Sequence, residues 1–72
     1  MGIDVQALTF KRDTHYNGKE WFGHGWTCVQ YPALTLIRRY WRKNRQVTEA
    51  WRFDGTEYAD AAGAIAALES TL

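Results

Sequence analysis

Two Asn/Asp-Gly dipeptides and a single proline divide this chain of 72 residues into short segments with the character of β-strands. Asn17-Gly18 and Asp54-Gly55 both favour type I′ turns, because the two central residues of such a turn need positive φ angles. Pro32 lies between these dipeptides and separates two predicted hairpins. The spacing of these signals predicts two antiparallel hairpins in one small domain that spans residues 1–72.

The first predicted hairpin turns at Asn17-Gly18 and returns along residues 20–31. Before the turn, apolar and polar residues alternate from Ile3 to Ala7, which is typical of a half-buried strand. In the return strand, Gly23-His24-Gly25 indicates either a bulge or a close approach of two backbones. Large rings surround these glycines and are expected either to pack in the core or to form an interface: Trp21, Phe22 and Trp26.

The second predicted hairpin joins residues 34–42 to residues 46–54. A loop with an odd number of residues, centred on Asn44, places Arg39 opposite Glu49 and Ile37 opposite Trp51. This register collects apolar side chains on one face of the hairpin. The opposite face then carries cationic and aromatic groups from both strands, namely Arg38, Tyr40, Arg42 and Arg52.

The C-terminal segment predicts a short edge strand followed by a helix. The Asp54-Gly55 turn folds residues 56–58 back onto the sheet, and Asp60 is a preferred N-cap for a helix that extends to Ser70. Gly63 either weakens this helix slightly or lets it approach the sheet closely. The helical stripe expected to face the sheet consists of Ala61, Ala64, Ile65, Leu68 and Leu72.

These segments together predict an α+β fold. The sheet is antiparallel, with four or five strands built from two hairpins plus the short edge strand, and one C-terminal α-helix packs on one face. The other face of the sheet is expected to stay partly open.

Charge is distributed unevenly along the chain, although its formal net value is only +1. The segment RRYWRKNR, residues 38–45, holds five of the nine basic residues, and residues 21–48 contain no Asp or Glu. No Lys or Arg follows Arg52. This polarity predicts a basic partner-binding surface and a secondary acidic surface. The basic surface comprises Arg38, Tyr40, Arg42, Lys43, Arg45 and Arg52, and the acidic one comprises Asp54, Glu57 and Asp60.

One interpretation of the basic segment is a docking face for an acidic protein or a nucleoprotein partner, and two others remain open. Arginines on alternate positions of one strand lie about 7 Å apart, close to the phosphate spacing of an extended single strand, and Tyr40 offers a ring for stacking. The alternative is a solvated face whose arginines are neutralised by ion pairs, with Arg39 paired to Glu49 and Arg52 to Glu57.

The sequence lacks the usual groups for catalysis or metal binding. His15, His24 and Cys28 are the candidate ligands or nucleophile and base, but a zinc site normally takes four ligands, and no fourth is apparent. There is no phosphate loop, nucleophile elbow or dinucleotide fingerprint. We therefore predict a non-enzymatic protein without a cofactor or metal.

The cysteine content and hydropathy pattern suggest a location. One cysteine excludes an internal disulfide, and no apolar run approaches the roughly 20 residues that cross a bilayer. We expect a soluble cytoplasmic protein, monomeric or weakly dimeric, without membrane contact.

The segment WRFDGTEYADAAGAIAALES, residues 51–70, resembles in its layout small phage and mobile-element proteins, including integrase arm-binding domains and anti-CRISPR proteins. A motif-free domain with nothing after Leu72 is more similar to the anti-CRISPR class. The resemblance implies an inhibitor that occupies a surface of a host defence nucleoprotein complex, such as a CRISPR effector. It transfers no functional residue, because no motif carries it.

Two other functions fit the same residues. One is a small DNA- or RNA-binding protein, or phage regulator, that uses the basic-aromatic hairpin at residues 38–45. The other is a structural subunit that self-associates through the open sheet face.

Overall fold

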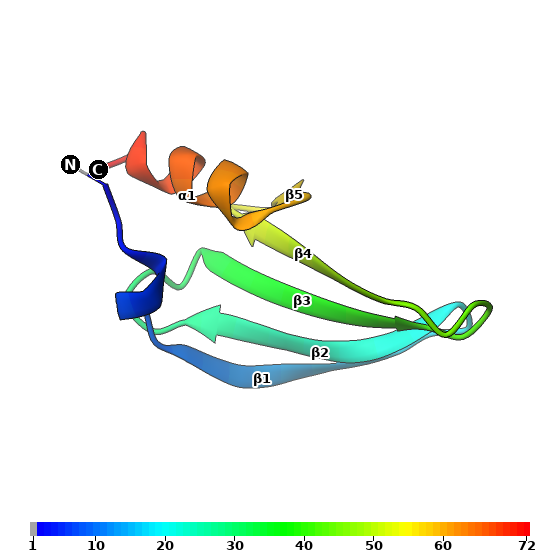
Figure 1. Cartoon of the computed structure of the whole chain (residues 1–72). Coiled ribbons are helices and arrows are strands. Elements are labelled where there is room, and N and C mark those ends of the chain that lie inside the picture. Colours follow the sequence, from blue (N-terminus) through cyan, green and yellow to red (C-terminus); the bar gives the residue numbers. More distant parts are fainter. Residues whose placement is uncertain (1) are drawn as a thin grey trace.

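The computed structural model describes residues 2–72, which form one antiparallel sheet of five strands in the order β1-β2-β3-β4-β5 and a single α-helix (Figure 1). This arrangement confirms the predicted α+β fold. A short 3-10 helix, Val5–Ala7, precedes the sheet. The elements are β1 (Phe10–Asn17), β2 (Trp21–Cys28), β3 (Leu34–Trp41), β4 (Val47–Phe53), β5 (Thr56–Tyr58) and α1 (Ala61–Glu69).

The molecule is elongated, with extents of 41 × 21 × 20 Å. Helix α1 lies over β4 and β5, and the N-terminal segment is at the same end of the molecule (Figure 1). We call this end, with α1, β5 and the N-terminal segment, the helix half. The two long hairpins project away from it, and their turns lie close together at the opposite end of the molecule (Figure 1). We call these turns, residues 17–20 and 41–46, the tip.

The apolar core lies between α1 and one face of the sheet. Helix residues Ala64, Ile65 and Leu68 pack against Cys28 and Leu34, and all five are buried. Partly buried side chains surround this cluster, including Phe10, Tyr31, Trp51, Phe53 and Tyr58.

The predicted helix is confirmed at both ends. Asp60 is the N-cap, and its carboxylate accepts a hydrogen bond of 3.0 Å from the Gly63 amide. A Cβ at Gly63 would lie 3.0 Å from the Tyr58 ring, so glycine permits the close approach of helix and sheet. Leu72 was wrongly assigned to the packed stripe, because it lies beyond the helix and is 74% exposed.

The predicted strand at Ile3–Ala7 is wrong. This segment contains the short 3-10 helix, whose N-terminus is capped by the Asp4 carboxylate through the Gln6 amide. Ile3, Val5 and Leu8 nevertheless pack against the core. The apolar spacing therefore indicated side chains that face the core. It did not identify the secondary structure, because this segment reaches the core without joining the sheet.

The first hairpin is confirmed, but its turn lies two residues later than predicted. Asn17 pairs with Phe22 in the sheet, and the Gly18 amide donates to the Trp21 carbonyl at 2.9 Å. Lys19 and Glu20 therefore occupy the centre of the turn, and neither has the positive φ of a type I′ turn. The chain also bulges in β1, where the pairing with β2 shifts between Arg12 and Thr14.

Close backbone approach, one of the two alternatives predicted for the Gly23-His24-Gly25 stretch, occurs at Gly23. A Cβ added there would collide with the Arg38 backbone carbonyl on β3. Gly25 instead lies beneath the side chains of Thr14 and Tyr16.

The predicted register of the second hairpin is wrong by one residue. The Trp41 amide donates to the Gln46 carbonyl at 2.8 Å, which leaves a loop with an even number of residues, 42–45. Arg38 therefore lies opposite Glu49, and Ile37 lies opposite Ala50. The loop closes because Arg45 adopts a positive φ of 58°, a conformation that its residue type does not predict.

The corrected register also moves Arg52 to the other face of the sheet. Arg52 lies opposite Thr35, and side chains alternate between faces along β3. The sequence had predicted that Arg52 shares a face with Arg38, Tyr40 and Arg42. This prediction is wrong, because Arg52 lies on the opposite face.

The third turn is the one predicted. Asp54 and Gly55 have φ angles of 52° and 85°, as a type I′ turn requires, and β5 covers the predicted residues. Within residues 2–72, no helix is both long and apolar enough to cross a membrane.

Candidate functional site

The arginines in the middle of the sheet are engaged in ion pairs. On the face that carries α1, Nε and Nη2 of Arg38 donate to one Glu49 oxygen at 3.0 and 2.7 Å. The Glu49 hydrogen bonds raise the pKa of Arg38 above its ordinary value, with a further contribution from Tyr40. The Arg38 guanidinium also lies 5.4 Å from the centre of the Trp26 ring.

The opposite face has a second, more buried arrangement. Nη1 and Nη2 of Arg39 donate to the two Glu57 oxygens at 3.2 and 2.8 Å, and the guanidinium lies 4.9 Å from the Trp21 ring centre. The Arg39 hydrogen bonds lower the pKa of Glu57. Arg52 lies 3.7 Å from the same carboxylate, which confirms the predicted Arg52–Glu57 pair. The predicted Arg39–Glu49 pair is wrong, since Arg38 takes Glu49.

The cations at the tip are left without such partners. In the part of the chain that the structure describes, no salt bridge involves Lys19, Arg42, Lys43 or Arg45. Glu20 is the carboxylate of the tip, so four cations and one anion give a net charge of +3 there. The helix half carries five carboxylates, those of Asp4, Asp54, Glu57, Asp60 and Glu69, of which Glu57 is paired with arginines. Charge is therefore separated along the long axis of the molecule.

Arg42 joins the two turns of the tip. Its backbone amide donates to the Glu20 carbonyl at 3.0 Å, and its side chain donates to the Gly18 carbonyl and the Asn17 side-chain oxygen at 3.2 and 2.9 Å. The guanidinium lies 4.8 Å from the Phe22 ring centre. Asn17 and Gly18, which suggested a turn in the sequence, instead supply acceptors that orient this arginine.

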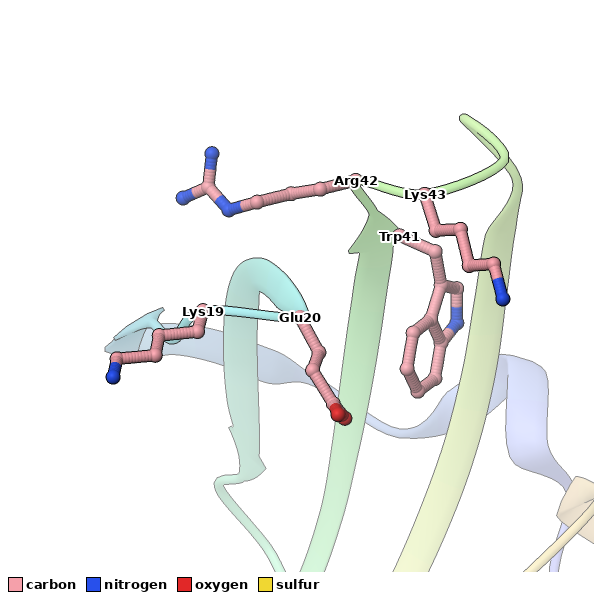
Figure 2. Close-up of a pocket in the computed structure, with 5 residues that line it drawn as sticks. All are labelled: Lys19, Glu20, Trp41, Arg42 and Lys43. Carbon is pink, nitrogen blue, oxygen red and sulfur yellow. The ribbon is translucent and has the colours of Figure 1, made fainter.

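Two shallow grooves flank Arg42. The first, of about 510 Å³, is lined by Lys19, Glu20, Trp41, Arg42 and Lys43. Figure 2 shows Lys43 beside the Trp41 indole and the Arg42 side chain extending away from both. The second, which we call the Tyr40 groove, has a volume of about 360 Å³ and is lined by Phe22, Tyr40, Trp41, Arg42, Arg45 and Gln46.

Aromatic rings extend from the tip along the face that carries α1. Phe22 and Tyr40 stack with their ring centres 5.2 Å apart and their planes at 16°. An arginine lies over each of Trp21, Phe22 and Trp26, but Phe22 is 38% exposed whereas both tryptophans are half-buried. Of the three rings that the sequence left between core and interface, Phe22 is thus the one most available to a partner.

The structure brings together only some of the predicted basic site. Tyr40, Arg42, Lys43 and Arg45 gather at the tip, while Arg38 is paired in mid-sheet and Arg52 lies on the opposite face. Glu57, a member of the predicted acidic surface, lies on the face opposite to Arg38 and is paired there. Sequence reasoning missed Lys19 and Gln46, and it left Phe22 between core and interface. Lys19 and Phe22 come beside the second hairpin through the pairing of β2 with β3, whereas Gln46 belongs to the turn of that hairpin itself. A meander with β2 and β3 adjacent would have pointed to Lys19 and Phe22.

The candidate ligands and nucleophile do not form a larger site. Cys28 is completely buried in the core, and the rings of His15 and His24 face each other across β1 and β2 with centres 5.3 Å apart. Residues 2–72 contain no group of three or more His, Cys, Asp or Glu side chains arranged to hold a metal ion.

We compared the chain with known protein families, curated proteins and solved structures. No protein family, no curated protein and no solved structure matches the chain.

Proposed function

We propose that this chain is a non-enzymatic binding protein whose tip holds the phosphate backbone of a nucleic acid, either free or within a nucleoprotein complex. The observation that supports this proposal best is the contrast between paired arginines in the sheet and unpaired cations at the tip. Glu49 and Glu57 neutralise Arg38 and Arg39, whereas the cations of the tip have no such carboxylate among the described residues.

Several cations close together favour a partner with regularly spaced negative charges. Phosphates release condensed counterions when Lys and Arg neutralise them, and this gives binding energy without base-specific contacts. Partly exposed rings beside the cations add stacking surface, which an acidic protein would use less well than a nucleic acid. Phe22 and Tyr40 supply that surface next to Arg42.

The test is the affinity of the protein for a labelled single strand of about 12 nucleotides, measured by fluorescence anisotropy over a range of salt concentrations. We expect affinity to fall steeply with salt. In the double variant Lys43→Gln/Arg45→Gln, the slope of log affinity against log salt should become shallower by about 1.4, since each lost phosphate contact removes about 0.7.

The matched control is Lys11→Gln/Arg12→Gln, which removes the same charge from β1, away from the tip. It should leave the salt slope unchanged. Absence of binding at low salt, or an equal loss of slope in both double variants, would rule out the tip as a phosphate-binding surface.

A second candidate function is inhibition of a host defence nucleoprotein complex, such as a CRISPR effector, by a phage or mobile-element protein in the host cytoplasm. The separation of charge supports it, because the helix half presents carboxylates to basic protein surfaces while the tip meets bound nucleic acid. The resemblance of residues 51–70 to anti-CRISPR proteins stays a prediction.

This second function predicts that the protein slows DNA cleavage by a purified CRISPR effector at concentrations that do not sequester the DNA itself. Charge reversal in the helix half, such as Asp54→Lys/Glu69→Lys, should relieve the inhibition while binding of free single strands persists. Unimpaired cleavage across a panel of effectors would remove support for this candidate.

A further inference from the structure

We infer that the Tyr40 groove accepts an unpaired nucleobase, so that the tip selects single-stranded nucleic acid over duplex. This inference rests on the proposed function and specifies its ligand. Phosphate binding alone would give a single strand no advantage over a base-free backbone and would favour the duplex, whose charge density is higher. A site for an unpaired base reverses that preference.

The groove has flat, stacked walls. Phe22 and Tyr40 lie nearly parallel, and the planar Arg42 guanidinium covers the Phe22 ring at 4.8 Å. Nucleobases stack on aromatic rings and on guanidinium planes regardless of their sequence, because every base has a π-face. Phe22 already contacts both Tyr40 and Arg42, so a base that enters the groove would stack at an end of this group, on Tyr40 or on the Arg42 guanidinium.

These walls are held in position before any ligand arrives. The Arg42 side chain is fixed by hydrogen bonds to the Gly18 carbonyl and the Asn17 side chain. Tyr40 and Phe22 are opposite partners in the paired strands β3 and β2, so their spacing is set by the sheet. A preformed site loses less conformational entropy when it binds its ligand.

The rim of the groove supplies the polar groups that a nucleotide needs. Gln46 offers an amide with both donors and an acceptor for the edge of a base. Arg45 also lines this groove, and Arg42 lines both grooves at the tip. A strand that places one base in the Tyr40 groove would carry its neighbouring phosphate toward Arg45 and continue past Lys43.

A paired base in a duplex is not available to such a site. Its faces are covered by the base pairs above and below, and only its edges are accessible in the grooves. The Tyr40 groove is about 360 Å³, which suits one base with part of its sugar rather than the width of a duplex.

The first test uses the unaltered protein with three ligands of equal length: a single DNA strand, a blunt duplex and a strand that lacks bases. At physiological salt we expect the single strand to bind about tenfold more tightly than the base-free strand, as one stacked base contributes, and more tightly than the duplex. Equal affinity for all three would overturn this inference while leaving phosphate binding at the tip intact. Binding of none of them would overturn the proposed function as well.

The second test separates stacking from charge with Tyr40→Leu. The preference for the single strand over the base-free strand should fall from about tenfold to nearly one, while the affinity for the base-free strand stays unchanged. The matched control is Trp26→Leu, an aromatic replacement on the same sheet face but outside the groove, which should keep the preference. Thermal melting of both variants establishes that they are folded. A full preference in folded Tyr40→Leu would contradict the inference.

Discussion

The helix half and the tip are held together by different kinds of interaction. In the helix half, α1 covers one face of the sheet and buries an apolar cluster that includes Leu34, Ile65 and Leu68. Toward the tip, no helix of residues 2–72 covers the sheet (Figure 1). Large side chains from its own strands cover it instead. Arginines lie over Trp21, Phe22 and Trp26 on its two faces.

The difference shows how a small sheet can extend beyond its core. An isolated hairpin is only marginally stable in water, and a sheet needs either an apolar layer or equivalent coverage. Arginine stems and stacked rings supply that coverage while keeping charge at the surface. The arginines nearest the core also have carboxylate partners. Within residues 2–72, those at the tip have none, and this contrast is the basis of the proposed anion-binding surface.

The largest effect on stability is expected at Gly23, where the sheet between the helix half and the tip has no room for a side chain. Gly23→Ala would drive a methyl group into the Arg38 carbonyl and force β2 and β3 apart. We expect a loss of more than about 3 kcal/mol in the free energy of unfolding, measured by chemical denaturation. The control is Gly25→Ala, whose methyl group meets the side chains of Thr14 and Tyr16 rather than backbone. Equal effects of the two variants would contradict this account of Gly23.

A smaller but substantial effect is expected in the helix half. Leu68 is 3% exposed, and Leu68→Ala leaves a cavity beneath α1 that should cost about 2–3 kcal/mol of unfolding free energy. The control is Val47→Ala, near the tip. Its free energy of unfolding should change by less than about 0.5 kcal/mol, because Val47 is 53% exposed. Comparable losses would mean that the apolar core extends to the tip.

The coverage by arginine is tested by Arg39→Met, which keeps much of the stem but removes the charge. The variant loses the paired hydrogen bonds to Glu57 and the contact with Trp21. We expect a loss of about 1–2 kcal/mol by denaturant titration. Arg45→Met, at the exposed tip, should have almost no effect on stability. A neutral Arg39→Met would show that packing alone covers this face.

The smallest expected effect is the dependence of stability on pH through Glu57. Arg39 lowers the pKa of Glu57 below its ordinary value of 4.5, so this carboxylate stabilises the fold above that pH. The contribution disappears as the pH falls through the lowered pKa and the group becomes protonated. It should amount to less than about 1 kcal/mol, because Glu57 is 43% exposed.

Melting temperatures of the unaltered protein and Glu57→Gln, compared from pH 7 to pH 3, measure this contribution. The two curves should converge as the pH falls below about 4.5. Parallel curves would show that the Arg39–Glu57 pair adds nothing to stability.

Some features set by local chemistry could be predicted from the sequence, although the Asn17-Gly18 signal placed its turn two residues too early. Asp54-Gly55 adopts the positive φ angles of its turn, and Asp60 caps the helix, because each residue acts on its immediate backbone. The register of the second hairpin was not predictable in this way. It depends on Arg45 adopting a positive φ, and no propensity of arginine indicates that conformation.

The site was predicted in part for the same reason. Tyr40, Arg42, Lys43 and Arg45 are neighbours in the sequence, and they remain neighbours at the tip. Lys19 and Phe22 come from a different hairpin and join them only through the pairing of β2 with β3. Which arginines stay unpaired depends on where Glu49 and Glu57 lie across the strands, and that depends on the register.

The most direct test of the central claim is to follow the backbone amide resonances of the protein while a short single strand is added. We predict shifts concentrated at the tip, residues 17–20 and 41–46, and at Phe22 and Tyr40, with α1 unaffected. Shifts centred on the helix half, or on the face around Arg39 and Arg52, would contradict the claim that the unpaired cations of the tip form the binding surface.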